Sequence, residues 1–321
     1  MKKLLCIVLA ALMCASVLTF VSCSDNDKYT VGICQLVTHP ALDQATQGFK
    51  DAVIAGLGEE NVEFIEQNAG NDIPLCTTIA NDFVSKNVDL IMANATPALQ
   101  AAASSTVDIP ILGTSVTEYG VALGINDFDG LVGGNISGTS DLAPLDEQAQ
   151  MIIDLCPNAE KIGLLYCSAE ANSKYQVDEV KKFLVEKGIA ADNIKEFAFT
   201  DSNDVSAVTA AAADFSDAIY VPTDNTVASN TEIINSVCLA AGVPVVAGEE
   251  GICSGCGIAT LSISYYDLGY LTGEMAVKIL KGEEKVNKMP IQYVTNLKKK
   301  YNKTNCDALG ITVPEDYVVI E

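Results

Sequence analysis

The segment YTVGICQLVTHPALDQATQGFKDAVIAGLG, residues 29–58, joins an apolar run to an amphipathic one. Residues 29–36 are apolar almost throughout, which is typical of a strand buried on both faces of a sheet. Pro40 is typical of the first turn of a helix, and Gly58 of the residue that ends one. The segment is therefore predicted to form one strand and one helix, the unit from which parallel α/β sheets are built.

The same alternation continues along the first third of the chain. Strands are predicted at residues 61–69, 89–95 and 109–116, and helices at 73–88 and 96–107. Because strands that alternate with helices pair in parallel, we expect the α/β class, with a doubly wound parallel sheet covered by helices on both faces.

The pattern begins again in the second half of the chain. EKIGLLYC (160–167) repeats YTVGICQL, and SDAIYVPTDNTVAS (216–229) repeats VDLIMANATPALQ (88–100). The matched landmarks keep their order and are Asp89 with Asp217 and Pro110 with Pro244. A sequence that repeats one supersecondary pattern predicts a structure that repeats it too.

We therefore expect two similar doubly wound lobes joined by a hinge. Residues 123–141 are rich in glycine and suit a crossing between the lobes. Lobe one is expected to comprise residues 30–118 and about 252–285. Lobe two is expected to comprise residues 119–251 and about 286–321.

Charge excludes one class of partner. The chain has 321 residues and a formal net charge of −23, and all 19 of its basic residues are lysine. A surface this acidic repels nucleic-acid phosphates, so nucleic-acid binding is excluded. Without arginine, the protein has no guanidinium to bind a carboxylate through two parallel hydrogen bonds.

The N-terminus indicates export. Residues 1–22 have a lysine-containing start and a long apolar run, which predict a signal peptide. Ser22 and Cys23 at its end resemble a bacterial lipobox, so we expect residues 23–29 to be a linker anchored through a lipidated Cys23. The expected location is the outer face of the bacterial cytoplasmic membrane. An uncleaved transmembrane anchor is the alternative, since the run is nearly long enough to span.

Eight of the 11 cysteines follow Cys23. Cys34, Cys167 and Cys238 lie inside apolar runs and are expected to be small buried hydrophobic residues. Cys253 and Cys256 form a CxxC motif without a second such pair or a nearby histidine. A zinc site is therefore not expected there, and free thiols or one local disulfide remain.

His39 is the only histidine, and it precedes Pro40 where the first strand gives way to a helix. No G-x-S-x-G element accompanies it, and only Asp43 lies at a spacing that suits a shared metal. We therefore expect it near the N-cap, shaping the loop or lining a cleft, rather than acting in catalysis. No catalytic residue, metal site or cofactor is predicted.

Ligands of open parallel α/β sheets bind beyond the carboxyl ends of the strands. The loops at those ends are rich in Ser, Thr, Asn and acidic residues, which suit a small polar ligand held between two lobes. Asp224 and Asn225 either cap the helix that follows or contact the ligand. Asn172 and Ser173 either cap a helix or bind a ligand carboxylate at the helix N-terminus.

Several motifs resemble the lipid-anchored substrate-binding proteins of bacterial ABC transporters, in the branch associated with tryptophan, tyrosine and phenylalanine uptake. They are VTHPALDQATQGFKDAV (37–53), QNAGNDIPLCTTIANDFV (67–84), DLIMANATPALQAAA (89–103), GGNISGTSD (133–141), YCSAEANS (166–173), YVPTDNTVAS (220–229) and YYDLGYLTGEMAVKILKGE (265–283). Glu118 and Tyr119 stand where the family usually has Asp-Pro. The resemblance implies the type 1 periplasmic-binding-protein-like fold, an amino-acid ligand and an ABC permease as partner.

With this resemblance, the Asp224 carboxylate is expected to pair with a ligand ammonium. The full set of expected ligand-binding residues is Thr38, Pro40, Leu42, Thr96, Ser115, Val116, Glu170, Asn172, Ser173, Asp224, Asn225 and Glu249. The expected protein is a monomer that captures an aromatic or other apolar L-amino acid for an importer. A ligand sensor of the same fold that signals to a separate membrane partner is the alternative, and an exported enzyme is the least supported.

Overall fold

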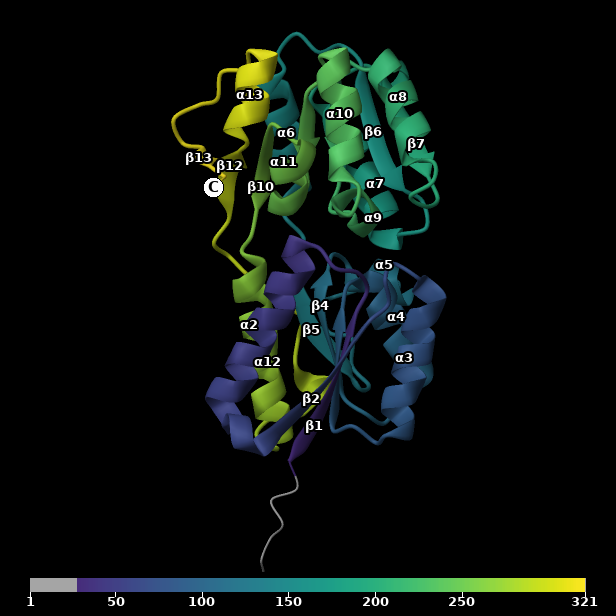
Figure 1. Cartoon of the computed structure of the whole chain (residues 1–321), viewed down its shortest axis with the longest axis vertical. Coiled ribbons are helices and arrows are strands. Elements are labelled where there is room, and N and C mark those ends of the chain that lie inside the picture. The colour runs from purple at the N-terminus through teal and green to yellow at the C-terminus, as the bar shows by residue number, and fades with distance from the viewer. Residues whose placement is uncertain (1–27, 321) are drawn as a thin grey trace, which may run out of the picture.

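The computed structural model describes residues 28–320 of the chain. The predicted signal peptide (1–22) and Cys23 lie outside the described residues. Two lobes are stacked along the long axis of the molecule, and each contains one sheet with helices on both faces (Figure 1). The two-lobe α/β fold predicted from the repeat is confirmed.

Lobe one contains a six-stranded sheet in the order β11-β5-β4-β3-β1-β2, in which every pairing is parallel. Its strands are β1 (Tyr29–Gln35), β2 (Val62–Asn68), β3 (Leu90–Asn94), β4 (Ile111–Val116), β5 (Ile136–Ser140) and β11 (Gln292–Tyr293). Its helices are α2 (Pro40–Leu57), α3 (Ile73–Ser85), α4 (Thr96–Ser105), α5 (Tyr119–Leu123) and α12 (Tyr265–Leu280).

Lobe two contains a seven-stranded sheet in the order β13-β12-β10-β9-β8-β6-β7, in which only the β10–β12 pairing is antiparallel. Its strands are β6 (Ile162–Cys167), β7 (Ile194–Phe199), β8 (Ala218–Val221), β9 (Val245–Ala247), β10 (Ala259–Ser262), β12 (Lys298–Tyr301) and β13 (Val318–Val319). Its helices are α6 (Leu145–Leu155), α7 (Ala171–Glu186), α8 (Val205–Phe215), α9 (Asn225–Ala228), α10 (Thr231–Ala241), α11 (Glu250–Cys256) and α13 (Lys303–Leu309).

The internal repeat is visible in the strand order and in individual hydrogen bonds. The order β2-β1-β3-β4-β5 in lobe one is matched by β7-β6-β8-β9-β10 in lobe two. The carboxylates of Asp89 and Asp217 both accept backbone N–H bonds at the start of the neighbouring strand. The carbonyls of Pro110 and Pro244 both accept a backbone bond of 2.9 Å, from Ile91 and Ile219 respectively. The landmarks matched in the sequence therefore occupy equivalent positions.

The sheets place the boundaries between the lobes at other residues than those predicted from the sequence. Residues 119–140 and 286–293 belong to lobe one, because β5 pairs with β4 and β11 pairs with β5. Residues 252–262 belong to lobe two, because β10 pairs with β9. The chain crosses between lobes at 141–144, 263–264 and 294–297, so only the end of the glycine-rich segment forms a crossing.

Helices α2 and α12 pack against each other on one face of the lobe-one sheet (Figure 1). Glycine permits a close backbone approach here. A Cβ atom on Gly269 would lie 1.9 Å from the carbonyl oxygen of Ala45, and one on Gly48 would lie 2.1 Å from that of Tyr266. Near the hinge, the two helices enclose a small apolar cluster that includes Leu268.

The eight cysteines of the described region are free thiols, and seven of them are buried. Cys253 and Cys256 are therefore unpaired in α11, and the free-thiol alternative holds. Within residues 28–320, no group of three or more His, Cys, Asp or Glu side chains is placed to hold a metal ion. No helix in this range has the length and apolar character needed to cross a bilayer.

Replacing Gly269 with alanine should push α2 and α12 apart, since the added methyl group meets backbone atoms that cannot rotate away. We expect Gly269→Ala to lower the free energy of unfolding by about 1–3 kcal/mol, measured by urea denaturation. Gly56→Ala is the control, because the atoms nearest its methyl group belong to the Val277 side chain at the same interface, which can shift, so the substitution should cost less. Equal stability of Gly269→Ala and the parent protein would contradict this account of the interface.

Candidate functional site

The carboxyl ends of the strands in the two sheets face each other across the cleft between the lobes. There the loops enclose a small, tightly packed cavity of about 10 Å³. It is lined by His39, Leu42, Ser115, Thr117, Asp141, Asn172, Thr223, Asp224, Asn225, Ala228, Glu249 and Tyr265. Both lobes contribute to this lining, so the cavity exists only when the lobes are closed on each other.

Half of the twelve residues selected from the sequence line this cavity, namely Leu42, Ser115, Asn172, Asp224, Asn225 and Glu249. The other six are placed elsewhere. Thr38 is exposed and accepts a hydrogen bond from Asn68. Val116 packs in the core of lobe one. Pro40 lines an adjoining hollow.

Thr96, Glu170 and Ser173 are buried near the cleft but do not line the cavity. Thr96 begins α4. The Oγ of Ser173 accepts a hydrogen bond of 3.4 Å from Asn172. Glu170 accepts hydrogen bonds from Asn225 and Thr226 within its own lobe.

Sequence reasoning missed Asp141, which lies directly after β5. It is 4% exposed, and its Oδ2 accepts a hydrogen bond of 2.9 Å from the Tyr265 hydroxyl. Its other carboxylate oxygen, Oδ1, is buried without a partner. Burial raises the pKa of this carboxyl group. The strand-end rule would have found Asp141 if β5 had been recognised as a strand of lobe one.

Three further cavity residues have a buried polar atom without a hydrogen-bond partner. The atoms are His39 Nδ1, Ser115 Oγ and Asn172 Oδ1. A buried polar atom without a partner is costly, so such atoms are rare in native proteins. Four of them around one cavity, Asp141 Oδ1 included, indicate a site that a polar ligand completes.

The His39 side chain crosses the cleft. Its Nε2 lies 3.2 Å from Asn225 Oδ1, and the amide nitrogen of Asn225 donates to Glu170 over 2.6 Å. Asn225 therefore presents its oxygen to the imidazole, and Nε2 must carry the proton. Burial lowers the pKa of His39, so the ring is neutral and Nδ1 is an acceptor. His39 occupies the N-cap position of α2, but its side chain does not cap the helix. It lines the cavity, so the predicted cleft-lining role is confirmed.

Two carboxylates of lobe two cap short helices at the cavity. Asp224 accepts backbone hydrogen bonds from Cys167 (2.7 Å) and Val227 (2.8 Å), and Glu249 accepts one of 2.6 Å from Gly251. Burial, followed by the charge of Glu170, raises the pKa of Asp224 to about 8. Burial also raises the pKa of Glu249 to about 7. Burial therefore disfavours full ionisation of these two acids.

Two of the five non-glycine residues with positive φ in the described part of the chain lie at strand ends beside the cleft. Ala95 follows β3 with φ of 94°, and Ser115 lies near the end of β4 with φ of 54°. Positive φ is uncommon for residues other than glycine and is often retained where function requires it. Here it places the Ser115 hydroxyl at the cavity.

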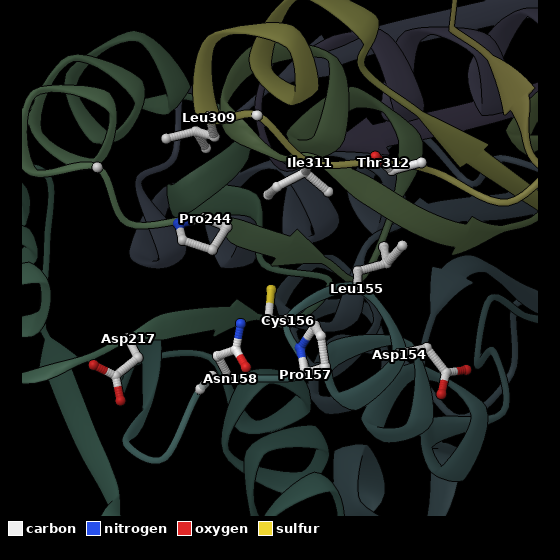
Figure 2. A pocket seen from close by; sticks show the side chains of 13 residues that line it. Asp154, Leu155, Cys156, Pro157, Asn158, Asp217, Pro244, Leu309, Ile311 and Thr312 are labelled. Carbon is white, nitrogen blue, oxygen red and sulfur yellow. The ribbon is translucent and has the colours of Figure 1, made fainter.

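A separate hollow lies at the other end of lobe two (Figure 2). It is formed where the loop of Cys156 and Pro157 faces the loops of Pro244 and Ile311. This is the amino end of the lobe-two strands, away from the edge at which such sheets bind ligands. Asp217 at its margin already accepts two backbone hydrogen bonds. We therefore assign the functional site to the smaller cavity between the lobes.

Two hinged lobes that close over a polar cavity define a ligand-binding protein of the periplasmic-binding-protein-like class. A family model of ABC transporter substrate-binding proteins matches residues 30–320. The chain belongs to this family and is a binding protein rather than an enzyme.

A tyrosine-binding protein of Clostridioides difficile is 36% identical over 97% of this chain and 93% of its own length. The crystal structure of a Streptococcus pneumoniae ABC domain in complex with L-Trp is 32% identical. It covers 92% of this chain and 100% of its own, with a TM-score of 0.86. The ligand-free, open structure of a C. difficile substrate-binding protein with adhesive properties is 38% identical. It covers 91% of this chain and 99% of its own, with a TM-score of 0.69.

The last two comparisons differ in their similarity of shape to this chain. The open structure is more similar to this chain in sequence but less similar in shape than the L-Trp complex. In the structure described here the lobes are closed on each other, because His39 of lobe one lies within hydrogen-bond distance of Asn225 of lobe two and Asn71 of lobe one donates a hydrogen bond to Thr226 of lobe two.

Proposed function

We propose that this protein is the extracytoplasmic substrate-binding component of an ABC importer and captures an aromatic or other apolar L-amino acid. The observation that carries the proposal is the buried, unpartnered carboxylate oxygen of Asp141 in the cavity between the lobes. The similarity to a tyrosine-binding protein and to an L-Trp complex supports the ligand class.

The cavity suits an ammonium group. Asp141 Oδ1, Asn172 Oδ1 and His39 Nδ1 are buried acceptors without partners, and an ammonium group has three N–H donors. Asp224 and Glu249 add negative charge to the same lining. Asp141 is the principal partner in this proposal, because both oxygens of Asp224 already accept backbone hydrogen bonds.

The ligand carboxylate requires donors other than arginine, which the chain lacks. We place it against the hydroxyl groups of Ser115 and Thr117, which line the cavity from lobe one. Both zwitterionic ends would then be held inside a closed cavity, where an unpaired charge would cost several kcal/mol.

We place the apolar part of the ligand against a different set of residues. Leu42, Ala228 and Tyr265 line the cavity, and Ala228 and Tyr265 also line the adjoining hollow. Pro40 and Ile263 extend the apolar surface of that hollow. An amino acid with a large apolar side chain fits this division between a polar and an apolar region better than a sugar does.

We further propose that residues 1–22 direct export and that a lipidated Cys23 anchors the protein, as a monomer, at the outer face of the bacterial cytoplasmic membrane. The apolar run that ends in Ser22 and Cys23 supports this proposal. An ABC permease in the same membrane would receive the ligand, as the family description suggests.

Asp141→Asn should weaken the binding of L-tyrosine or L-tryptophan by about 2–5 kcal/mol, because it removes the charge paired with the ammonium group. Asparagine can still accept the hydrogen bond from Tyr265, so the fold should be kept. Calorimetric titration is the measurement. The variant should also lose its preference for L-tyrosine over the analogue that lacks the amino group.

The matched control is Asp154→Asn, which removes an exposed carboxylate at the far end of lobe two and should leave binding unchanged. If Asp141→Asn binds both amino acids as tightly as the parent protein, the assignment of the ammonium site is wrong.

The affinity should increase as the pH rises. Asp224 and Glu249, with pKa values of about 8 and about 7, hold protons near neutral pH before the ligand binds. A bound ammonium stabilises the ionised carboxylates and lowers these pKa values, so binding releases protons. The gain should be largest between about pH 6 and 8 and approach tenfold per pH unit for each proton released. Titrations in buffers of different ionisation enthalpy measure this release, and a constant affinity would contradict the proposal.

Cys23→Ala should abolish incorporation of labelled fatty acid in a bacterial host, since the thiol that would carry the lipid is absent. Cys14→Ala, inside the predicted signal peptide, is the control and should still be labelled. Labelling of Cys23→Ala at the parent level would refute the lipid anchor.

A further inference from the structure

Glu170 organises the start of α9 at the mouth of the cleft. It is 2% exposed, and its carboxylate accepts four hydrogen bonds. Oε2 accepts from the backbone and side-chain nitrogens of Asn225, over 3.1 and 2.6 Å. Oε1 accepts from the backbone nitrogen and the hydroxyl of Thr226, both over 2.9 Å. Both side chains are therefore fixed by one buried carboxylate.

The same two side chains also reach lobe one. Asn225 Oδ1 meets His39 Nε2 over 3.2 Å, and Thr226 Oγ1 accepts a hydrogen bond of 3.2 Å from the Asn71 side chain. His39 follows β1 and Asn71 follows β2, so two loops of lobe one are held. We call these five residues, Glu170, Asn225, Thr226, His39 and Asn71, the closure latch.

The carboxylate sets the direction of each hydrogen bond between the lobes. Because the amide nitrogen of Asn225 donates to Glu170, its oxygen faces His39. Because the Thr226 hydroxyl donates its proton to Glu170, its oxygen remains free to accept from Asn71. A neutral side chain at position 170 cannot accept all four bonds.

We propose that Glu170 is a positioning residue for lobe closure, which stabilises the closed state without touching the ligand. The sequence predicts a ligand contact at Glu170, but its side chain does not line the cavity. The inference rests on the proposed function in that closure serves ligand capture, although every hydrogen bond of the latch joins two protein atoms.

Loss of the latch has a characteristic effect on binding. A ligand that requires the closed state binds with an apparent Kd that rises as the closed fraction falls. The factor is the same for every ligand, because it belongs to the protein alone. A residue that contacts the ligand would instead change the ratio of affinities between ligands.

The test uses Glu170→Gln in the otherwise unchanged protein. Small-angle X-ray scattering without ligand should show a larger radius of gyration than the parent protein. Titration with L-tyrosine and with L-tryptophan should show the same loss of affinity for both, about 3- to 30-fold. Glu160→Gln, an exposed substitution in lobe two, is the control and should change neither quantity.

Asn71→Gly gives a second variant in case Glu170→Gln does not fold. Asn71 has φ of 66°, which glycine adopts freely, and the substitution removes the lobe-one half of one hydrogen bond. It should also enlarge the unliganded protein. An unchanged radius of gyration in the folded variants, or a loss confined to one amino acid, would overturn the latch. If neither amino acid binds the parent protein, the proposed ligand fails, but the scattering comparison still tests the latch.

Discussion

The arrangement of residues 28–320 depends on the contact between α2 and α12. Helix α12 follows the second sheet in sequence, yet it packs on the first lobe, where Gly269 allows its backbone to touch that of α2. The chain must therefore return to lobe one after building most of lobe two. It then crosses again to add β12 and β13, so three segments of the described part of the chain connect the lobes. Three adjacent connections restrict the relative motion of the lobes to bending about one side, which is the motion a clamp requires.

Much of the fold follows from local sequence patterns. Each apolar run of lobe one became a strand close to its expected bounds, and the repeat predicted two similar lobes, whose sheets share one strand order in the structure. Asp89 and Asp217 explain why the repeat could be recognised in the sequence, since each side chain accepts a backbone N–H hydrogen bond at the equivalent position of its own lobe. The boundaries between the lobes could not be predicted from local sequence patterns. Pairing between segments that are distant in the sequence decides which sheet β5 or β10 joins. The residues of the strand itself do not indicate its partner.

The candidate site was predictable to a similar depth. The strand-end rule located the correct loops, but it does not say which side of a loop faces the cleft. Ser115 and Val116 are neighbours in sequence, yet one lines the cavity and the other packs in the core. Glu170 and Asp141 are both buried acids beside the cleft, and only the three-dimensional structure shows that the first is saturated by its own lobe while the second has an unpartnered oxygen.

The eight free thiols of the described region have a consequence for how the protein is made and handled. Seven of them are buried, where they act as small apolar side chains and are shielded from oxidants. An unfolded chain exposes all eight at once, and eight thiols can pair in 105 ways. None of these pairings exists in the native structure described here. Folding must therefore be completed before the thiols are oxidised. Refolding from denaturant requires a reductant that prevents non-native disulfides from forming.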